Sequence, residues 1–187
     1  MSSDELNAFL ETVRKFREKE LEPFILDWEE KGEILPEAVL KKSYEIGLFN
    51  FWHSTNEQEC ALLPELRAKL LVLKELAQSS ADLAWLVAIQ IIAHQVLSFA
   101  PEKIKNRILE ENKPTQAGSS LLLFTLGIWE PGVKTQSEIK SQVNFKTGKV
   151  SLNKQLVIFA QRADWLIFSV KNEDDKPGWI LVKQPEL

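Results

Sequence analysis

Few residues in this 187-residue chain could carry out chemistry. The single cysteine, Cys60, has no companion base near it in the sequence, and a thiol nucleophile needs such a base. Of the two histidines, His53 stands beside a tryptophan in a loop-like stretch and His94 stands on an apolar helix pattern. We interpret His53 as a surface residue and His94 as a core histidine with a hydrogen-bond partner. One cysteine also excludes a cysteine-based zinc site, so we predict no structural metal.

The composition is that of a folded protein. Hydrophobic residues make up 44% and charged residues 27%, which is near the globular average. The net charge of −4 offers no basic surface for nucleic acid. The first residues form no secretion signal, and one cysteine excludes a disulfide framework. We therefore expect a cytoplasmic protein that binds no nucleic acid.

One apolar stretch, residues 81–100, is long enough to cross a membrane. Asp82, Gln90 and His94 lie within it, and each is costly in hydrocarbon. We interpret the stretch as a buried core helix and expect no membrane association.

The elements that must position any site differ between two parts of the chain. Residues 1–117 contain two of the seven glycines, with 14 basic and 20 acidic residues (net −6). Residues 118–187 contain five glycines, with 9 basic and 7 acidic residues (net +2). We place a domain boundary in the turn-rich stretch between them, which gives a helical domain at 1–116 and a β-domain at 117–187.

Apolar residues at helical spacing predict a helical bundle in the first part. The first helix pattern is interrupted at Pro23, and Gly32 and Gly47 are expected to end helices. Ser79 or Ser80 is expected to cap the apolar helix, and Pro101 to start the last one. The helix before the apolar one is expected to bury a face made by Leu66, Leu70, Leu73 and Leu76.

From Gly118 the spacing of apolar residues approaches two, which predicts strands. They fall at 121–125, 139–145, 150–152, 165–170 and 179–182, with turn signals at Thr147-Gly148 and Pro177-Gly178. Tight turns favour antiparallel pairing of neighbouring strands. The predicted fold class is therefore α+β, an N-terminal all-α helical bundle followed by a small antiparallel β-barrel or sandwich.

Six stretches, in order along the chain, resemble the acyl-CoA dehydrogenase family. They are residues 13–23 (VRKFREKELEP) with 28–36 (WEEKGEILP), 76–84 (LAQSSADLA), 99–109 (FAPEKIKNRIL), 129–132 (WEPG) and 163–166 (ADWL). The resemblance implies the family's N-terminal helical domain and part of its middle β-domain. It further implies FAD as cofactor and acyl-CoA as ligand, because the family oxidises acyl thioesters to enoyl thioesters.

The resemblance also implies that this chain is not a self-sufficient enzyme. In the family, the catalytic carboxylate lies in a C-terminal helical domain, whereas this chain stops at Leu187 within the β-domain. We therefore expect no catalytic residue here, and a homo-oligomer or a second chain that supplies the missing domain is a possible partner.

The positions that resemble the family's flavin segments are altered. Where the family has Thr-Glu-Pro-Gly-x-Gly-Ser, this chain has Trp129 in place of the threonine and Lys134 in place of the later glycine. Thr135 alone could replace the serine that touches the pyrophosphate. The family's Trp-Ile-Thr run corresponds roughly to Gln155–Ala160, which lacks both the tryptophan and the threonine. By resemblance the candidate cofactor-binding residues are Trp129 and Thr135, although Trp129 could instead pack against its own sheet.

Glu130 and Pro131 are expected to fix the geometry of the turn, and the charged stretch Asn172–Asp175 is expected to be a solvated hairpin tip. Three interpretations remain open. The chain is a relative of acyl-CoA dehydrogenase that is inactive alone, a non-catalytic ligand-binding or protein-interaction module, or a truncated gene product that folds without any retained activity.

Overall fold

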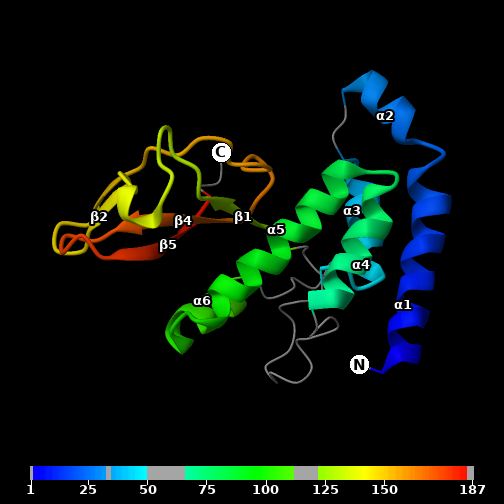
Figure 1. The fold of residues 1–187 in the computed structure, drawn as a ribbon, viewed down its shortest axis with the longest axis horizontal. Helices are drawn as coiled ribbons and strands as arrows, with labels where there is room; N and C mark the ends of the chain where they lie inside the picture. The colour runs from blue at the N-terminus through cyan, green and yellow to red at the C-terminus, as the bar shows by residue number, and fades with distance from the viewer. Residues whose placement is uncertain (1, 33–34, 50–65, 112–121, 185–187) are drawn as a thin grey trace. The chain divides into compact units, whose positions relative to one another are not determined.

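The computed structural model describes residues 2–32, 35–49, 66–111 and 122–184 (Figure 1). Two compact units make up the chain: the helical unit, Met1–Leu121, and the sheet unit, Leu122–Leu187. The predicted boundary at residue 116 falls outside the described residues. Each unit is described by itself below.

The helical unit begins with α1, Ser3–Phe16, which continues into a π-helical turn, Arg17–Leu21. Ser2 caps α1 reciprocally: the Glu5 N–H donates to the Ser2 hydroxyl (3.2 Å), and the Ser2 N–H donates to the Glu5 carboxylate (2.6 Å). After the predicted interruption at Pro23, the short helix α2, Ile25–Lys31, ends at Gly32, whose φ of 71° only glycine adopts without strain. The predicted interruption at Pro23 and the predicted helix end at Gly32 are confirmed.

The helix α3, Glu37–Glu45, follows Pro36, and α4 spans Leu66–Ala77. The predicted buried face of α4 is wrong in part, because Leu66 and Leu70 are 70% and 56% exposed. The buried residues of α4 are Ala68, Val72, Glu75 and Leu76. The spacing of apolar residues could not predict this face, because it includes Glu75, a carboxylate that is buried together with Arg17.

The helix α5, Ala81–Ser98, is the core helix of this unit, and α6 spans Glu102–Glu111. Ser80 caps α5 as predicted, accepting a hydrogen bond from the Leu83 N–H (3.2 Å). Among the described residues, α5 is the one helix long and apolar enough to cross a membrane, but 44% of it is buried inside the protein and it packs against α4. A buried core helix passes the same test of length and composition, and this agrees with the sequence-based interpretation.

The sheet unit contains one mixed five-stranded sheet in the order β1-β4-β2-β3, with β5 on the other edge of β4. The strands are β1 (Phe124–Gly127), β2 (Gln142–Asn144), β3 (Lys149–Ser151), β4 (Trp165–Lys171) and β5 (Pro177–Lys183). The α+β class is as predicted, a helical part followed by a sheet. The strand pairing differs from the prediction, because β4 runs parallel to β1 and to β2. Turn signals report only on strands that follow one another, whereas β1 and β4 are separated by two other strands.

The β2–β3 turn lies at Thr147-Gly148 as predicted, and Gly148 has a φ of 68°. The turn between β4 and β5 is shorter than predicted, because Pro177 and Gly178 already belong to β5. Asn172 closes it instead: its side-chain oxygen accepts the N–H groups of Asp174 (3.1 Å) and Lys176 (2.8 Å).

One hydrophobic cluster of the sheet unit is formed by Phe168 and Val170 of β4 with Val143 of β2, and Trp165 and Ile167 of β4 are buried as well. Gly127 at the end of β1 lies directly against the Phe168 ring: a Cβ added there would lie 2.3 Å from a ring carbon. Glycine is required at this position for close packing.

Candidate functional site

The turn after β1 contains Glu130, a carboxylate buried within the sheet unit. Only 5% of this residue is exposed, whereas its neighbour Trp129 is 68% exposed. The Glu130 carboxylate accepts the backbone N–H groups of Lys140 (2.6 Å) and Ser141 (3.2 Å). These bonds hold the loop that joins β1 to β2 in one path, so Glu130 fixes the turn, as the sequence predicted.

Lys154 is the charged partner of Glu130. Its side chain is 3% exposed, and its ammonium group pairs with the Glu130 carboxylate and donates to the Ser169 hydroxyl of β4 (2.9 Å). Burial by itself would raise the pKa of Glu130, but the hydrogen bonds from Lys154, Ser141 and Lys140 lower it to about 2. The pair is therefore ionised and connects three segments of the sheet unit. Sequence reasoning missed Lys154, which stands between the polar residues Asn153 and Gln155 and carries no local signal of burial.

The two segments that resemble flavin segments lie side by side. The Gln155 N–H donates to the Trp129 carbonyl (2.9 Å), and the Thr125 hydroxyl of β1 donates to the Ile158 carbonyl. Leu156 has a left-handed backbone, with a φ of 53°, which is unfavourable for a side chain of this kind. The bonds on either side of Leu156 hold it there, and its side chain is 77% exposed. The structure thus brings together two exposed apolar side chains on adjacent segments, Trp129 and Leu156.

Thr135 caps a short 3-10 turn, Gln136–Glu138. Its own N–H and that of Lys134 both donate to the Glu138 carboxylate (3.3 and 2.7 Å), and its hydroxyl lies 2.9 Å from that of Ser137. These backbone hydrogen bonds, that of Lys134 first, lower the pKa of Glu138. The polar groups of the turn are therefore already engaged with a carboxylate of the same chain. Glu138 was not predicted, although Thr-x-x-Glu is a recognisable capping pattern.

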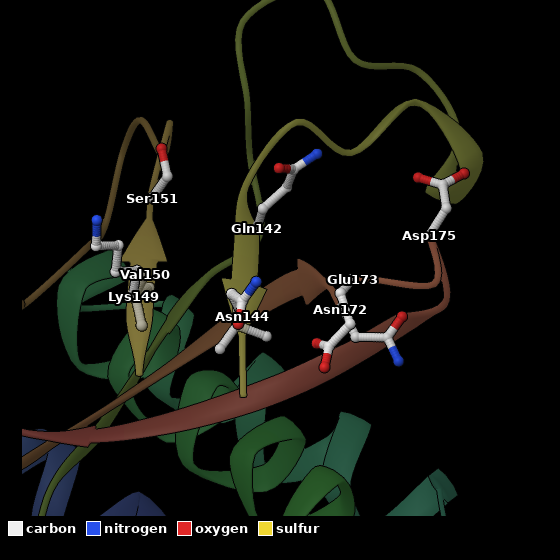
Figure 2. A pocket seen from close by; sticks show the side chains of 9 residues that line it. Gln142, Asn144, Lys149, Val150, Ser151, Asn172, Glu173 and Asp175 are labelled. Carbon is white, nitrogen blue, oxygen red and sulfur yellow. The ribbon is translucent and has the colours of Figure 1, made fainter. Parts of the chain in front are cut away.

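A groove of about 610 Å³ lies between β2, β3 and the β4–β5 turn. Figure 2 shows Lys149 and Ser151 on one side of it and Asp175 on the other. The Asp175 carboxylate pairs with the Lys171 ammonium (2.7 Å), and the Glu173 carboxylate accepts the Phe145 N–H (3.3 Å). Asn172, Glu173 and Asp175 of the predicted hairpin tip therefore line this groove, and the carboxylates of Glu173 and Asp175 have partners within the sheet unit.

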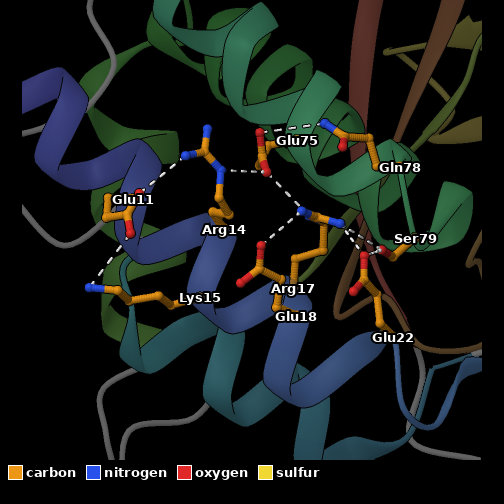
Figure 3. A network of polar contacts seen from close by, with 9 residues as sticks. All are labelled: Glu11, Arg14, Lys15, Arg17, Glu18, Glu22, Glu75, Gln78 and Ser79. Atoms are coloured by element: carbon orange, nitrogen blue, oxygen red, sulfur yellow. Dashed lines mark hydrogen bonds and ion pairs between the residues drawn. The ribbon is translucent and has the colours of Figure 1, made fainter.

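A second polar cluster belongs to the helical unit and is centred on Glu75 of α4 (Figure 3). One Glu75 carboxylate oxygen accepts from the guanidinium Nε of Arg17 (3.2 Å) and from that of Arg14 (3.3 Å). The side chains of Arg17 and Glu75 are 11% and 12% exposed, and Arg17 also pairs with Glu22. The cluster therefore clamps α1 and the π-helical turn that follows it to α4.

The remaining candidates from the sequence offer no site. His94 is half-buried on α5, while His53 and Cys60 lie outside the described residues. In the described ranges, no group of three or more acidic, histidine or cysteine side chains is placed to hold a metal.

Comparison with known proteins places the chain in a family. Residues 3–112 match the acyl-CoA dehydrogenase N-terminal domain. The chain belongs to the acyl-CoA dehydrogenase family. A comparison with curated protein sequences found no match.

Solved acyl-CoA dehydrogenase structures have the same fold as the whole chain. An acyl-CoA dehydrogenase from Geobacillus kaustophilus matches 99% of it with a TM-score of 0.75 and 19% identity. The chain is also similar to butyryl-CoA dehydrogenase from Megasphaera elsdenii, which matches 99% of it with a TM-score of 0.74 and 19% identity. Glutaryl-CoA dehydrogenase from Mycobacterium smegmatis, in complex with FADH2, matches 99% of it with a TM-score of 0.77 and 18% identity. The chain spans about half the length of these relatives, since it covers 49%, 50% and 46% of them. The predicted resemblance and the predicted α+β fold class are confirmed.

Members of the acyl-CoA dehydrogenase family bind FAD. The turn in this chain does not fit the pyrophosphate of FAD as it stands, because the Lys134 and Thr135 N–H groups already donate to the Glu138 carboxylate. Leu156 offers no hydrogen-bond donor, and Trp129 offers only its indole N–H where the family has a threonine. The assignment of Trp129 and Thr135 to cofactor binding stays a prediction.

Proposed function

We propose that this chain is a non-oxidising member of the acyl-CoA dehydrogenase family and acts as a ligand-binding or protein-interaction module. The proposal rests on one observation: the Glu138 carboxylate accepts hydrogen bonds from the backbone N–H groups of Lys134 and Thr135. A phosphate group needs free donors of this kind. It would have to displace Glu138 and would be repelled by the carboxylate it displaced.

The display of apolar side chains supports the same proposal. The buried Glu130–Lys154 pair keeps the scaffold of the turn, while Trp129 and Leu156 stand exposed on it at 68% and 77%. Aromatic and aliphatic groups held on a rigid turn suit an apolar partner better than a charged cofactor.

The test is the visible absorption spectrum of the purified full chain, before and after incubation with FAD and gel filtration. We expect no bound flavin and no oxidation of acyl-CoA. The Mycobacterium smegmatis glutaryl-CoA dehydrogenase, whose structure is a complex with FADH2, serves as the positive control for flavin retention when treated in the same way. A stoichiometric flavin band in the purified chain would overturn the proposal.

A second candidate is FAD-dependent oxidation of acyl-CoA together with another chain that supplies the rest of the family fold. The observation in its favour is that 99% of the chain follows the fold of relatives twice its length. In that case Trp129 and Thr135 would face the cofactor. Co-purification from the native cell separates the two candidates, because a stable complex with a chain resembling the C-terminal half of the family would favour the second.

We also propose a cytoplasmic location, because one cysteine in 187 residues leaves no disulfide framework to stabilise a secreted protein. Fractionation of native cells with an antibody against the chain tests it, and recovery outside the cytoplasmic fraction would contradict it.

A further inference from the structure

One segment of the sheet unit combines a strained backbone with fixed ends. We name residues 154–163 the strap; it comes directly before the start of β4. Of the residues that the structure describes, three besides glycine have a positive φ: Leu156 (53°), Phe159 (59°) and Asp175 (60°). Aspartate tolerates this backbone as a single residue, whereas a bulky leucine or phenylalanine is an outlier there. Both of these outliers lie in the strap, three residues apart.

The two ends of the strap are anchored in the sheet unit. At its start, the Lys154 ammonium group pairs with the Glu130 carboxylate and donates to the Ser169 hydroxyl (2.9 Å). Just after its end, the Asp164 N–H donates to the Leu123 carbonyl (2.8 Å), and the Asp164 carboxylate accepts the Leu123 N–H (2.7 Å). The backbone between these anchors is therefore the part of the strap that can change conformation.

Three contacts hold the middle of the strap in its strained conformation. The Gln155 N–H donates to the Trp129 carbonyl (2.9 Å), and the Thr125 hydroxyl of β1 donates to the Ile158 carbonyl. Val157 packs against the hydrophobic cluster on β2 and β4. Strained residues persist only where surrounding contacts over-determine the backbone, and they are concentrated at ligand clamps and switch regions.

The strain and the contacts that oppose it are of similar size. Leu156 is 77% exposed and Phe159 is half-buried, so burial of these side chains among the described residues does little to offset the strain. Each strained residue favours relaxation of the strap by about fivefold or more. The net contribution of each opposing hydrogen bond is of the same order. The balance is therefore narrow, as a two-state element requires.

We propose that the strap is a conformational switch with a closed and an open state. In the closed state, which is the one described here, both outliers are left-handed and Gln155 is bonded to the turn at Trp129. In the open state both outliers relax to an extended backbone, the hydrogen bonds to Gln155 and Ile158 break, and the turn loses its contact with the strap. A ligand of the turn that favours one state shifts the strap with it. This regulation rests on the proposed function, because the turn is the proposed binding element.

The first experiment measures the exchange of single amides in the full chain by NMR. The N–H groups of Gln155, Arg162 and Ala163 report on opening, because each is hydrogen-bonded in the closed strap. Leu156→Gly removes the strain at one outlier, since glycine adopts a positive φ as readily as a negative one. It should slow exchange at these amides by about threefold or more.

The matched control is Gln155→Gly at the neighbouring position, whose φ is not positive. Glycine there relieves no strain and adds only chain freedom, so exchange across the strap should become about two- to fivefold faster. The backbone N–H of residue 155 is kept, so its bond to Trp129 remains possible. Opposite effects at adjacent positions distinguish strain from simple loop flexibility.

The second experiment removes one of the holding contacts. Thr125→Val keeps the size of a fully buried side chain but leaves the Ile158 carbonyl without its donor. Exchange across the strap should become about fivefold faster or more. Adding Leu156→Gly to Thr125→Val should return the rates towards those of the wild type, because part of the strain that drives opening is gone. This rescue excludes misfolding as the cause, and the amides of the helical unit are the internal reference.

The proposal is overturned if Leu156→Gly speeds exchange as Gln155→Gly does, if Thr125→Val leaves the strap unchanged, or if the double variant is not rescued. Different responses of the three reporting amides to Leu156→Gly would also overturn it, because one switch has one common opening. All of these rates are measured on the chain without ligand. They therefore stay separate from the flavin test, in which a bound flavin would overturn the proposed function and leave the exchange results as they are.

Discussion

Replacing Lys154 with methionine tests whether the buried ion pair holds the turn of the sheet unit. The Glu130 and Lys154 side chains are 0% and 3% exposed, and the pKa of Glu130 is lowered from 4.5 to about 2. A difference of about 2.5 pKa units corresponds to about 3 kcal/mol of stability from the ionised carboxylate. Removal of one partner from a buried pair costs about 3–5 kcal/mol. We therefore expect Lys154→Met to destabilise the sheet unit by about 3 kcal/mol at neutral pH.

The ion pair also predicts how the stability of the sheet unit changes with pH. The folded-state pKa of Glu130 lies below its unfolded value, so the contribution is complete above pH 4.5 and is lost as the pH falls from 4.5 towards 2. In Lys154→Met the pKa of Glu130 is lowered less, because the largest hydrogen-bonding cause is gone. The stability of the variant should therefore fall less steeply over that pH range than that of the wild type.

The assay is amide hydrogen exchange by mass spectrometry together with urea unfolding of the full chain at pH 7 and pH 3. Exchange should accelerate at Lys140 and Ser141, whose N–H groups bond to Glu130, and not in the helical unit. Lys31→Met is the matched control, because it removes an exposed ion pair with Asp27 and should cost less than about 1 kcal/mol. Equal stability of Lys154→Met and wild type, or equal pH slopes, would refute the reasoning.

The remaining predictions concern single side chains. Gly127→Ala should destabilise the sheet unit by about 1–3 kcal/mol in urea, because the new Cβ would lie 2.3 Å from the Phe168 ring, whereas Gly178→Ala meets nothing within 4 Å and should change stability by less than about 0.5 kcal/mol. Glu75→Gln should cost the helical unit about 1–3 kcal/mol in thermal unfolding followed by circular dichroism, since two guanidinium groups lose their carboxylate, and an unchanged transition would contradict the clamp. Ser80→Ala should cost about 1 kcal/mol and accelerate amide exchange in the first turn of α5; unchanged exchange there would show that the cap contributes little.

The fold could be predicted from the sequence where its signals are local. Helix ends at Gly32 and the cap at Ser80 depend on residues within one turn, and both predictions are confirmed. The buried face of α4 and the parallel pairing of β1 with β4 could not be predicted in this way. Glu75 is buried because of Arg17, which lies 58 residues away, and β1 pairs with a strand 41 residues further along.

The candidate site likewise contains residues that local sequence signals predict and residues that depend on long-range contacts. The resemblance identified the two segments that the structure brings together, at Trp129 and at Gln155–Ala160. Lys154 could not be predicted, because it stands between two polar residues and its partner Glu130 lies 24 residues away. Glu138 is different: its capping pattern was visible in the sequence, but its effect on the donors of the turn follows only from the geometry.

β4 pairs with strands that lie at very different distances from it in the sequence, and these distances predict the order in which the sheet unit folds. The β4–β5 hairpin closes between Lys171 and Pro177, only six residues apart, whereas β1 must find β4 across 41 residues. Closing the short loop loses less chain entropy, so we expect the hairpin to form before β1 docks on β4. Substitutions within the hairpin should therefore slow refolding, while substitutions in β1 should chiefly speed unfolding.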